Sequence, residues 1–165
     1  MTAVRAASDP AALPAGFLEE LDRRVGPRGW SVEPGQLALH AAEQWGAWRG
    51  RAPLLLRPAT TAQVATVLGL CHAHDVPVVP QGGNTGLVGA GVPDETGRLA
   101  VLSLARLNRI REIDPLNDTI TAEAGCVLEA VQNAALEADR LFPLSLGAQG
   151  SCQIGGNIEI GRAHV

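Results

Sequence analysis

The pattern of apolar and polar residues predicts a strand–helix–strand unit near the middle of the chain. Residues 54–56 are a run of leucines that ends before Pro58, as expected of a short buried strand. Thr60 and Gln63 then have the spacing of a helix-capping box. Apolar residues follow at the spacing of one helix face: Val64, Val67, Leu68 and Cys71. A second apolar run at residues 76–79 completes a βαβ unit, which predicts parallel strands and a right-handed crossover.

Further elements are predicted on both sides of this unit. They are a helix over residues 17–25, a strand over 99–104, a hairpin whose second strand covers 119–124, and a helix over 127–138. The first helix is expected to end at Gly26 and Pro27. Residues 1–53 are predicted to be a helical and irregular lead-in to a domain that covers residues 54–158.

The irregular part of this lead-in holds the three tryptophans of the chain, Trp30, Trp45 and Trp48. Such a segment could be an interface, a flap that faces a cofactor, or ordinary packing. Packing is the favoured interpretation, because tryptophan buries well wherever its N–H finds a partner.

A glycine-rich loop follows the second apolar run, with the sequence PQGGNTG at residues 80–86. Glycine has no Cβ, so a ligand can lie against the main chain there, and successive N–H groups can form a concave nest for an anion. The loop leaves the carboxyl end of a strand, where α/β sheets usually bind ligands. The pattern predicts a phosphate cradle. A plain turn between two strands stays an alternative, because glycine motifs alone are weak signals.

Composition narrows the possible chemistry. The net charge of −4 argues against a nucleic acid or an anionic membrane surface as partner. No apolar run approaches the roughly 20 residues of a membrane span, and no secretory signal is visible. All 13 basic residues are arginines and there is no tyrosine. This excludes a Walker-type lysine, a Schiff-base lysine, a lysine base and a phenol acid within these residues.

The cysteines and histidines do not predict a metal site. Cys71, Cys126 and Cys152 are far apart without a CxxC spacing, so they are interpreted as small buried apolar residues, reduced as in the cytosol. His72 and His74 lie two apart near the end of a predicted helix and do not share a face. They are interpreted as solvated histidines that complement the helix dipole rather than as metal ligands.

A second glycine-rich stretch begins near Phe142 and includes Gly147, Gly150, Gly155 and Gly156. Two glycine-rich loops favour a long ligand clasped between them. Three sequence segments then occur in a familiar order: PQGGNTGLVGAGVP at residues 80–93, LSLARLNRIREIDPLNDTITAEAG at 102–125, and LFPLSLGAQGSCQIGGNI at 141–158.

In these segments the chain resembles the N-terminal FAD-binding domain of flavin-linked D-2-hydroxyacid dehydrogenases. This family includes D-lactate, D-2-hydroxyglutarate and glycolate dehydrogenases. The resemblance is strong over residues 54–158 and weak before them. It implies an α+β fold of the PCMH or vanillyl-alcohol-oxidase type, with a small parallel βαβ subdomain and a mixed or antiparallel sheet with flanking helices. The absence of GxGxxG after the strand agrees with a fold that is not of the Rossmann type.

The resemblance also implies FAD as cofactor. Some relatives carry a histidine after the double glycine that bonds covalently to the flavin, whereas this chain has Asn84, which implies noncovalent FAD. The residues implied to bind the cofactor are Pro80, Gln81, Gly82, Gly83, Asn84, Thr85, Gly86, Leu87, Gly125, Pro143, Gly147, Gly150, Ser151, Gly155, Gly156 and Asn157. For Ser151 and Asn157, turn capping is the alternative interpretation.

The implied reaction oxidises a D-2-hydroxyacid, D-lactate or D-2-hydroxyglutarate, to the 2-oxoacid by hydride transfer to flavin N5. In this family the base, the substrate arginines and any metal ligands belong to a later C-terminal half that this chain lacks. We therefore expect no catalytic residue and no metal ligand here, a 2-hydroxyacid bound through that half, and no activity of this chain alone.

Further expectations of the resemblance are a cytoplasmic or peripherally membrane-associated enzyme and a possible homodimer. Two other functions stay open. They are another FAD-linked alcohol or alditol oxidase of the same fold, and a non-catalytic nucleotide-binding module.

The last seven residues, EIGRAHV at 159–165, depart from the family, which continues after GGNI with a run of small residues of the ATNAGG kind. This heptapeptide equals the translation of a common sequencing-adapter oligonucleotide. We expect it to be an artefact outside the fold.

Overall fold

The computed structural model describes residues 13–159, so the start of the lead-in and residues 160–165 of the adapter-like segment lie outside the described part. Its centre is a four-stranded sheet in the order β1–β2–β4–β3. Strand β2 (Leu55–Leu56) and strand β3 (Val78–Gln81) both run parallel to β4 (Ala100–Ser103), which lies between them. Strand β1 (Trp30–Ser31) pairs antiparallel with β2 at the edge. The predicted parallel strands are confirmed.

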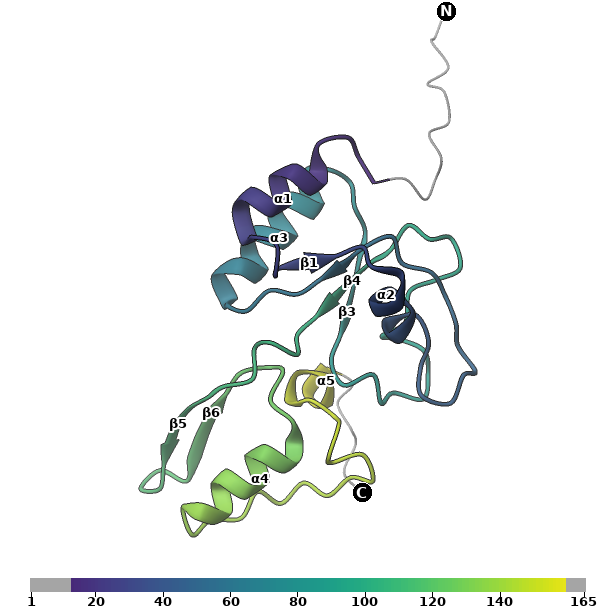
Figure 1. Cartoon of the computed structure of the whole chain (residues 1–165). Coiled ribbons are helices and arrows are strands. Elements are labelled where there is room, and N and C mark those ends of the chain that lie inside the picture. The colour runs from purple at the N-terminus through teal and green to yellow at the C-terminus, as the bar shows by residue number, and fades with distance from the viewer. Residues whose placement is uncertain (1–12, 160–165) are drawn as a thin grey trace, which may run out of the picture.

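Helices cover both faces of this sheet (Figure 1). On one face lie α1 (Phe17–Val25) and α3 (Thr61–Ala73), which share a buried core with Leu54, Leu56 and Leu102. On the other face α2 (Pro34–His40) packs through Leu37 against Leu55, Val79 and Val101. Burial on both faces explains why the strands consist of uninterrupted apolar runs.

Helix α3 begins as predicted but presents a different face to the core. The Thr60 hydroxyl accepts a hydrogen bond from the Gln63 N–H at 3.1 Å, and the Gln63 side chain accepts one from the Ala59 N–H at 2.8 Å. The predicted cap is therefore confirmed. The predicted apolar face is wrong at Leu68, which is 43% exposed, because Leu70 is buried in its place.

The reason for this difference is that two stripes of α3 have the same helical spacing. The packed stripe runs through residues 67, 70 and 71 and continues to His74. The His74 ring packs edge-on against Phe17 of α1, with ring centres 5.2 Å apart, and its Nε2 lies 3.2 Å from a Glu20 carboxylate oxygen. Contact with α1 selects the face, so His74 is half-buried rather than solvated.

Residues 29–51, which were predicted to be irregular, contain β1 and α2. A strand of two residues is too short for a periodic pattern, and α2 places Pro34 in its first turn, where proline lacks only an N–H that the helix does not use. Helix α1 is part of the same core as β2, because Phe17 and Leu21 are fully buried in it.

The second half of the chain builds the lower part of Figure 1. Strands β5 (Ile110–Asp114) and β6 (Thr119–Ala122) form the predicted antiparallel hairpin. Helix α4 (Leu128–Glu137) confirms the predicted alanine-rich helix. Helix α5 (Ile154–Glu159), in the second glycine-rich stretch, was not predicted. No helix within residues 13–159 has the length and apolar character needed to cross a membrane.

A buried carboxylate holds the base of the hairpin together, and Arg111 connects this base to the start of α3. Glu123 is 4% exposed and accepts hydrogen bonds from Arg109 and Arg111, each at 3.0 Å. Arg111 also donates to the Thr61 hydroxyl at the start of α3, at 3.3 Å. The hydrogen bond from Arg109, which is the largest contribution, lowers the pKa of Glu123 from 4.5 to about 2.

This lowered pKa predicts acid lability. A carboxyl whose pKa is lower in the folded than in the unfolded chain adds stability that is complete above the unfolded-state value. We expect the free energy of unfolding to fall as the pH drops from 4.5 to about 2. Urea unfolding across this range should show a flatter pH dependence for Glu123→Gln. Glu112→Gln, an exposed change on β5, should keep the wild-type profile, and an unchanged profile for Glu123→Gln would refute the prediction.

Candidate cofactor-binding site

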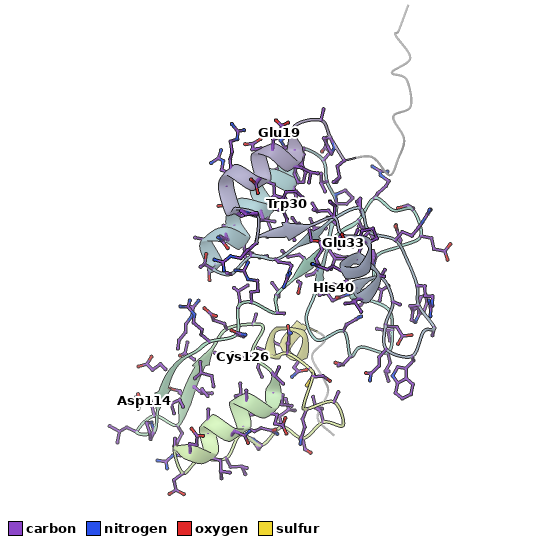
Figure 2. The ribbon with its side chains drawn as sticks, in the orientation of Figure 1. Glu19, Trp30, Glu33, His40, Asp114 and Cys126 are labelled. Carbon is purple, nitrogen blue, oxygen red and sulfur yellow. The ribbon has the colours of Figure 1, made fainter. Side chains whose placement is uncertain are left out.

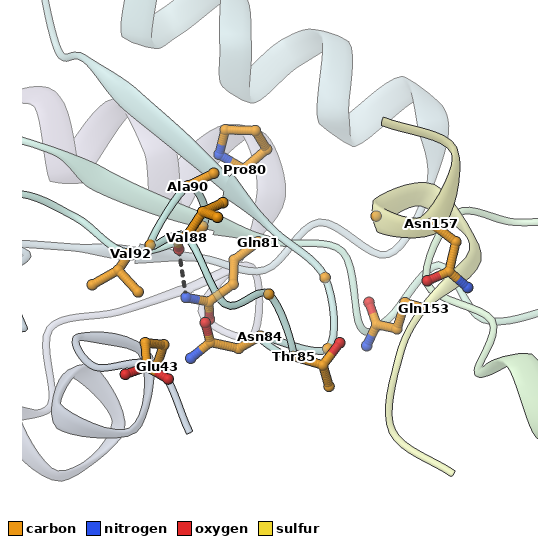
Figure 3. A pocket seen from close by; sticks show the side chains of 16 residues that line it. Glu43, Pro80, Gln81, Asn84, Thr85, Val88, Ala90, Val92, Gln153 and Asn157 are labelled. Atoms are coloured by element: carbon orange, nitrogen blue, oxygen red, sulfur yellow. Dashed lines mark hydrogen bonds between the residues drawn. The ribbon is translucent and has the colours of Figure 1, made fainter. Parts of the chain in front are cut away.

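A pocket of about 180 Å³ lies where the first glycine-rich loop faces the start of α5 (Figure 3). Its walls come from three segments far apart in the sequence. The lining residues are Glu43, Pro80, Gln81, Gly82, Gly83, Asn84, Thr85, Gly86, Val88, Gly89, Ala90, Gly91, Val92, Gln153, Gly156 and Asn157. The loop begins at the carboxyl end of β3, the edge of the sheet that the sequence pattern indicated.

The loop presents backbone N–H groups rather than charged side chains. From Gly82 to Gly91, no backbone N–H donates a hydrogen bond to an acceptor within residues 13–159. Asn84 and Gly89 have positive φ values of 53° and 70°, the left-handed conformation that turns successive N–H groups toward one side. Free N–H groups on a concave loop attract an anion, so the structure fits the predicted phosphate cradle.

The two glycine-rich segments touch at Gly83. A Cβ added to Gly83 would lie 2.0 Å from the backbone oxygen of Ser151, which leaves no room for a side chain. At Gly82 an added Cβ would lie 3.5 Å from the Gln153 side chain, an ordinary contact. The close approach of the segment around Ser151 therefore depends on glycine at position 83.

Gln81 closes the base of the loop. Its side chain is buried, and its Nε2 donates to the backbone oxygens of His40 at 3.0 Å and of Gly91 at 2.7 Å. Its Oε1 lies 2.5 Å from His40 Nδ1. The bond to Gly91, drawn as a dashed line in Figure 3, joins the two ends of the loop. Asn84 adds a further anchor by donating to the Ala42 oxygen at 2.7 Å.

The segment that receives these anchors carries a buried carboxylate of its own. Glu43 is 5% exposed and accepts hydrogen bonds from the backbone N–H groups of Trp45 and Ala47, each at 2.5 Å, and of Trp48 at 3.3 Å. The bond from Trp45, the largest contribution, holds the pKa of Glu43 below its usual range. Both carboxylate oxygens are engaged, so Glu43 shapes a turn although it lines the pocket.

This turn places Trp48 against the glycine-rich loop. A Cβ added to Gly89 would lie 2.7 Å from the Trp48 ring. Trp30 packs as expected and donates its Nε1–H to Asp22 at 3.2 Å. Trp45 is 75% exposed, so the interpretation as ordinary packing does not hold for this residue. Trp48 packs against Gly89 but does not line the pocket, so a flap that faces a cofactor stays a prediction.

The structure brings together part of the predicted site. Residues 80–86, Gly156 and Asn157 line the pocket, whereas other predicted residues do not: Leu87, Gly125, Pro143, Gly147, Gly150, Ser151 and Gly155. Leu87 is 67% exposed. Ser151 lies next to Gly83 through its backbone oxygen. Residues outside the pocket stay predictions as cofactor ligands.

Gly125 and Gly155 have a role in packing instead. A Cβ on Gly125 would lie 2.0 Å from the Leu104 oxygen, and one on Gly155 would lie 2.8 Å from the Ala124 Cβ.

The sequence did not predict that Glu43, residues 88–92 and Gln153 would line the pocket. Only the glycines of 88–92 gave a signal, because the positions of Glu43 and Gln153 depend on contacts between distant segments.

The pocket fits a phosphate-sized part of a dinucleotide. Its volume of about 180 Å³ is less than the roughly 300–1,000 Å³ that whole ligand sites usually enclose. None of its lining residues is an arginine or a histidine, so no cationic side chain of the lining would contact an anion there. The model for the FAD binding domain family matches residues 52–163. The chain belongs to the FAD binding domain family. The predicted α+β fold of PCMH type and the predicted cofactor, FAD, are confirmed.

Individual relatives of this FAD-binding domain point to one group of enzymes. The chain is 43% identical over 128 residues to a Schizosaccharomyces pombe protein assigned as a mitochondrial D-lactate dehydrogenase, covering 76% of this chain and 24% of that protein. It is 39% identical over 152 residues to the mitochondrial D-2-hydroxyglutarate dehydrogenase of Bos taurus, covering 88% and 27%. The chain thus spans about a quarter of the length of the curated relatives it matches.

Solved structures show the same fold at low identity. An alkyldihydroxyacetonephosphate synthase superposes with a TM-score of 0.80 at 18% identity, covering 92% of this chain and 30% of the synthase. A p-cresol methylhydroxylase superposes with a TM-score of 0.64 at 20% identity, covering 84% and 28%. These similarities establish the fold of the FAD-binding domain and nothing more specific.

The contact at Gly83 gives a testable prediction. Gly83→Ala should lower the free energy of unfolding by about 1–3 kcal/mol, as overpacking usually does, because backbone must move away from the new methyl group. Gly147→Ala is the matched control, since nothing lies within 4 Å of a Cβ there. Urea unfolding of both variants measures the effect. Equal stability of the two would contradict the contact.

Glu43 gives a second prediction. Glu43→Ala removes the acceptor of three backbone N–H groups, so the turn with Trp48 should loosen. We expect a change in tryptophan fluorescence and a several-fold weaker affinity for FAD, measured by flavin fluorescence titration. Gln44→Ala, an exposed change in the same turn, should alter neither quantity. Wild-type affinity in Glu43→Ala would show that the turn does not support the loop.

Proposed function

We propose that this chain is the FAD-binding portion of an oxidoreductase that oxidises a D-2-hydroxyacid to the corresponding 2-oxoacid. The observation that carries the proposal is the loop at residues 82–91, which lines a pocket and whose backbone N–H groups find no acceptor among residues 13–159. Such a loop can hold a pyrophosphate without lysine, which this chain lacks. Bound FAD would supply the hydride acceptor, flavin N5.

In this proposal the residues of the chain bind and orient the cofactor. The loop N–H groups hold the pyrophosphate, and Gln81 keeps the loop closed through its bonds to His40 and Gly91. The turn around Glu43 supports the loop from outside. Because the pocket matches only a phosphate-sized part, the flavin and adenine ends extend beyond it, toward surfaces that include the second glycine-rich segment.

We further propose that FAD is held noncovalently. The residue after the double glycine is Asn84, and a carboxamide is not a nucleophile that could bond to the flavin. Its amide donates to the Ala42 oxygen at 2.7 Å, so the side chain is committed to fixing the loop. Protein denatured by heat should release all its flavin into solution.

The substrate class rests on the relatives. Their names include D-lactate and D-2-hydroxyglutarate dehydrogenases, so we propose one of these two acids as substrate, bound by a part of such an enzyme that residues 1–165 do not match. The chain alone would then bind FAD without turnover. Several relatives are named as mitochondrial proteins. A cytoplasmic location and a homodimer stay predictions.

Two measurements test the proposal. The purified chain should take up FAD from solution, with a flavin absorption spectrum that survives gel filtration and is lost to the supernatant on heating. A chain that FAD cannot colour would refute the cofactor role.

A chimera tests whether this FAD-binding portion supports the proposed reaction, with residues 13–158 in place of the matching quarter of the Bos taurus relative. Anaerobic D-2-hydroxyglutarate should bleach its flavin, and the L-enantiomer should not. The same chimera with Gly83→Ala serves as the impaired control. If both enantiomers leave the flavin oxidised in a chimera that binds FAD, this chain does not work as the FAD-binding portion of a D-2-hydroxyacid dehydrogenase.

A further inference from the structure

His40 lies beside the glycine-rich loop, although neither the sequence pattern nor the resemblance gave it a role. It is the last residue of α2 (Figure 2). Helix α2 packs through Leu37 against the core of the sheet, so contacts outside the loop hold the main chain that leads to His40. His40 is therefore a fixed point against which the loop can be placed.

The orientation of the Gln81 amide follows from the groups around it. Its nitrogen, Nε2, donates to the backbone oxygens of His40 at 3.0 Å and of Gly91 at 2.7 Å. A carbonyl oxygen can only accept a hydrogen bond, so the nitrogen of the amide, and not its oxygen, must face these two groups. The amide oxygen, Oε1, is thereby turned toward the His40 ring, where it lies 2.5 Å from Nδ1.

This orientation determines which nitrogen of the His40 ring carries hydrogen. Oε1 is an acceptor, so Nδ1 must be the donor, which in a neutral ring is the Nδ1–H tautomer. The ring and the main-chain oxygen of His40 then hold both ends of one amide, whose nitrogen also reaches Gly91. Gln81 is 2% exposed, so its Oε1 would lose its partner without gaining water if the ring donor were removed.

The amide held in this way connects the two ends of the loop at residues 82–91. Gln81 ends β3 immediately before the loop, Gly91 is the last residue of the loop, and both line the pocket. An unsatisfied buried acceptor is costly, so without the ring donor the amide would be driven to rotate toward another partner. Such a rotation would also break the bond to Gly91 and let the loop ends separate.

We infer that His40 is a positioning residue for the cofactor-binding loop, acting through the hydrogen bond from its Nδ1–H to the Gln81 amide oxygen. The inference rests on the proposed function and extends it to a residue that does not line the pocket. His40 fixes the amide, and the amide holds the loop in the closed shape that the proposed pyrophosphate site requires.

Three substitutions of nearly equal shape separate the donor from the ring. The amide nitrogen of asparagine occupies the same δ position as imidazole Nδ1, so His40→Asn keeps a donor toward Oε1. His40→Leu removes the donor, and His40→Asp replaces it with an acceptor. The measurement is the FAD dissociation constant of the full 165-residue chain, obtained by flavin fluorescence titration.

His40→Leu should weaken FAD binding about tenfold, as expected for one lost buried hydrogen bond. Binding should not vanish, because the loop keeps its other anchor, from Asn84 to the Ala42 oxygen. His40→Asn should recover most of the affinity that His40→Leu loses, and His40→Asp should bind no better than His40→Leu. His72→Leu, an exposed change on α3, is the control and should bind FAD as the wild type does.

A double-substitution cycle shows whether His40 acts through Gln81. Gln81→Met removes the amide, so His40→Leu should cause no further loss of FAD affinity in a Gln81→Met background. A role of the ring in the packing of α2 would instead weaken binding by the same factor in both backgrounds. Circular dichroism and urea unfolding establish that each variant is folded.

Nitrogen-15 NMR of the histidine rings measures the tautomer directly. At a pH where the ring is neutral, long-range proton–nitrogen correlations should show the His40 hydrogen on Nδ1 and none on Nε2. The signals missing from His40→Asn identify His40. In Gln81→Met, where no partner fixes the ring, both tautomers should appear. This measurement uses the wild-type chain without cofactor, so it decides even if His40→Leu fails to fold.

Several outcomes would overturn the inference. A neutral His40 ring with its hydrogen on Nε2 would rule out the bond to Gln81. Wild-type FAD affinity in folded His40→Leu would show that the loop does not need the ring. Equal losses in His40→Asn and His40→Leu would assign the effect to the ring itself and not to its donor. If the wild-type chain does not bind FAD, the proposed function fails and the role of His40 in it, whereas the NMR measurement still tests the bond.

Discussion

The contact on which the site depends is the approach of Ser151 to Gly83, two backbones with no room for a side chain between them. It joins the loop after β3 to a segment nearly seventy residues later, and so joins the sheet to the lower part of the molecule (Figure 2). Similar contacts extend this junction, because Gly125 lies against the Leu104 backbone and Gly155 against Ala124. The pocket exists because backbone can lie directly on backbone at these glycines.

Close backbone packing also determines which groups can bind an anion in the pocket. At Gly83 and Gly89 the loop has no space for a side chain, and the chain has no lysine. Its free N–H groups provide the positive potential instead. Glu43 would oppose an anion if its carboxylate were free, yet three backbone N–H groups already surround it. The same carboxylate that lines the site therefore stabilises the turn behind it.

Local patterns were sufficient to predict most of the fold. The cap at Thr60, the hairpin ending at Ala122 and helix α4 each follow from a few neighbouring residues, and the structure confirms them. Features that depend on tertiary contacts were not predictable. Strand β1 has two residues and exists through pairing with β2, and α3 has two equally spaced apolar stripes of which contact with Phe17 selects one. For the site, the glycine-rich loop was visible in sequence, whereas Glu43 and Gln153 reach it only through the fold.

Glycines in this chain therefore have two structural roles, and a glycine-rich sequence motif alone does not distinguish them. In the loop at residues 82–91, which lines the pocket, the backbone N–H groups have no acceptor within residues 13–159, and Asn84 and Gly89 have positive φ values. At Gly125 and Gly155 glycine allows protein to touch protein, and no ligand is needed to explain it. Gly83 has both roles, because it lines the pocket and meets Ser151. A cofactor bound at Gly83 would contact the junction between the two halves of the fold. Cofactor binding and backbone packing should therefore be coupled at this residue.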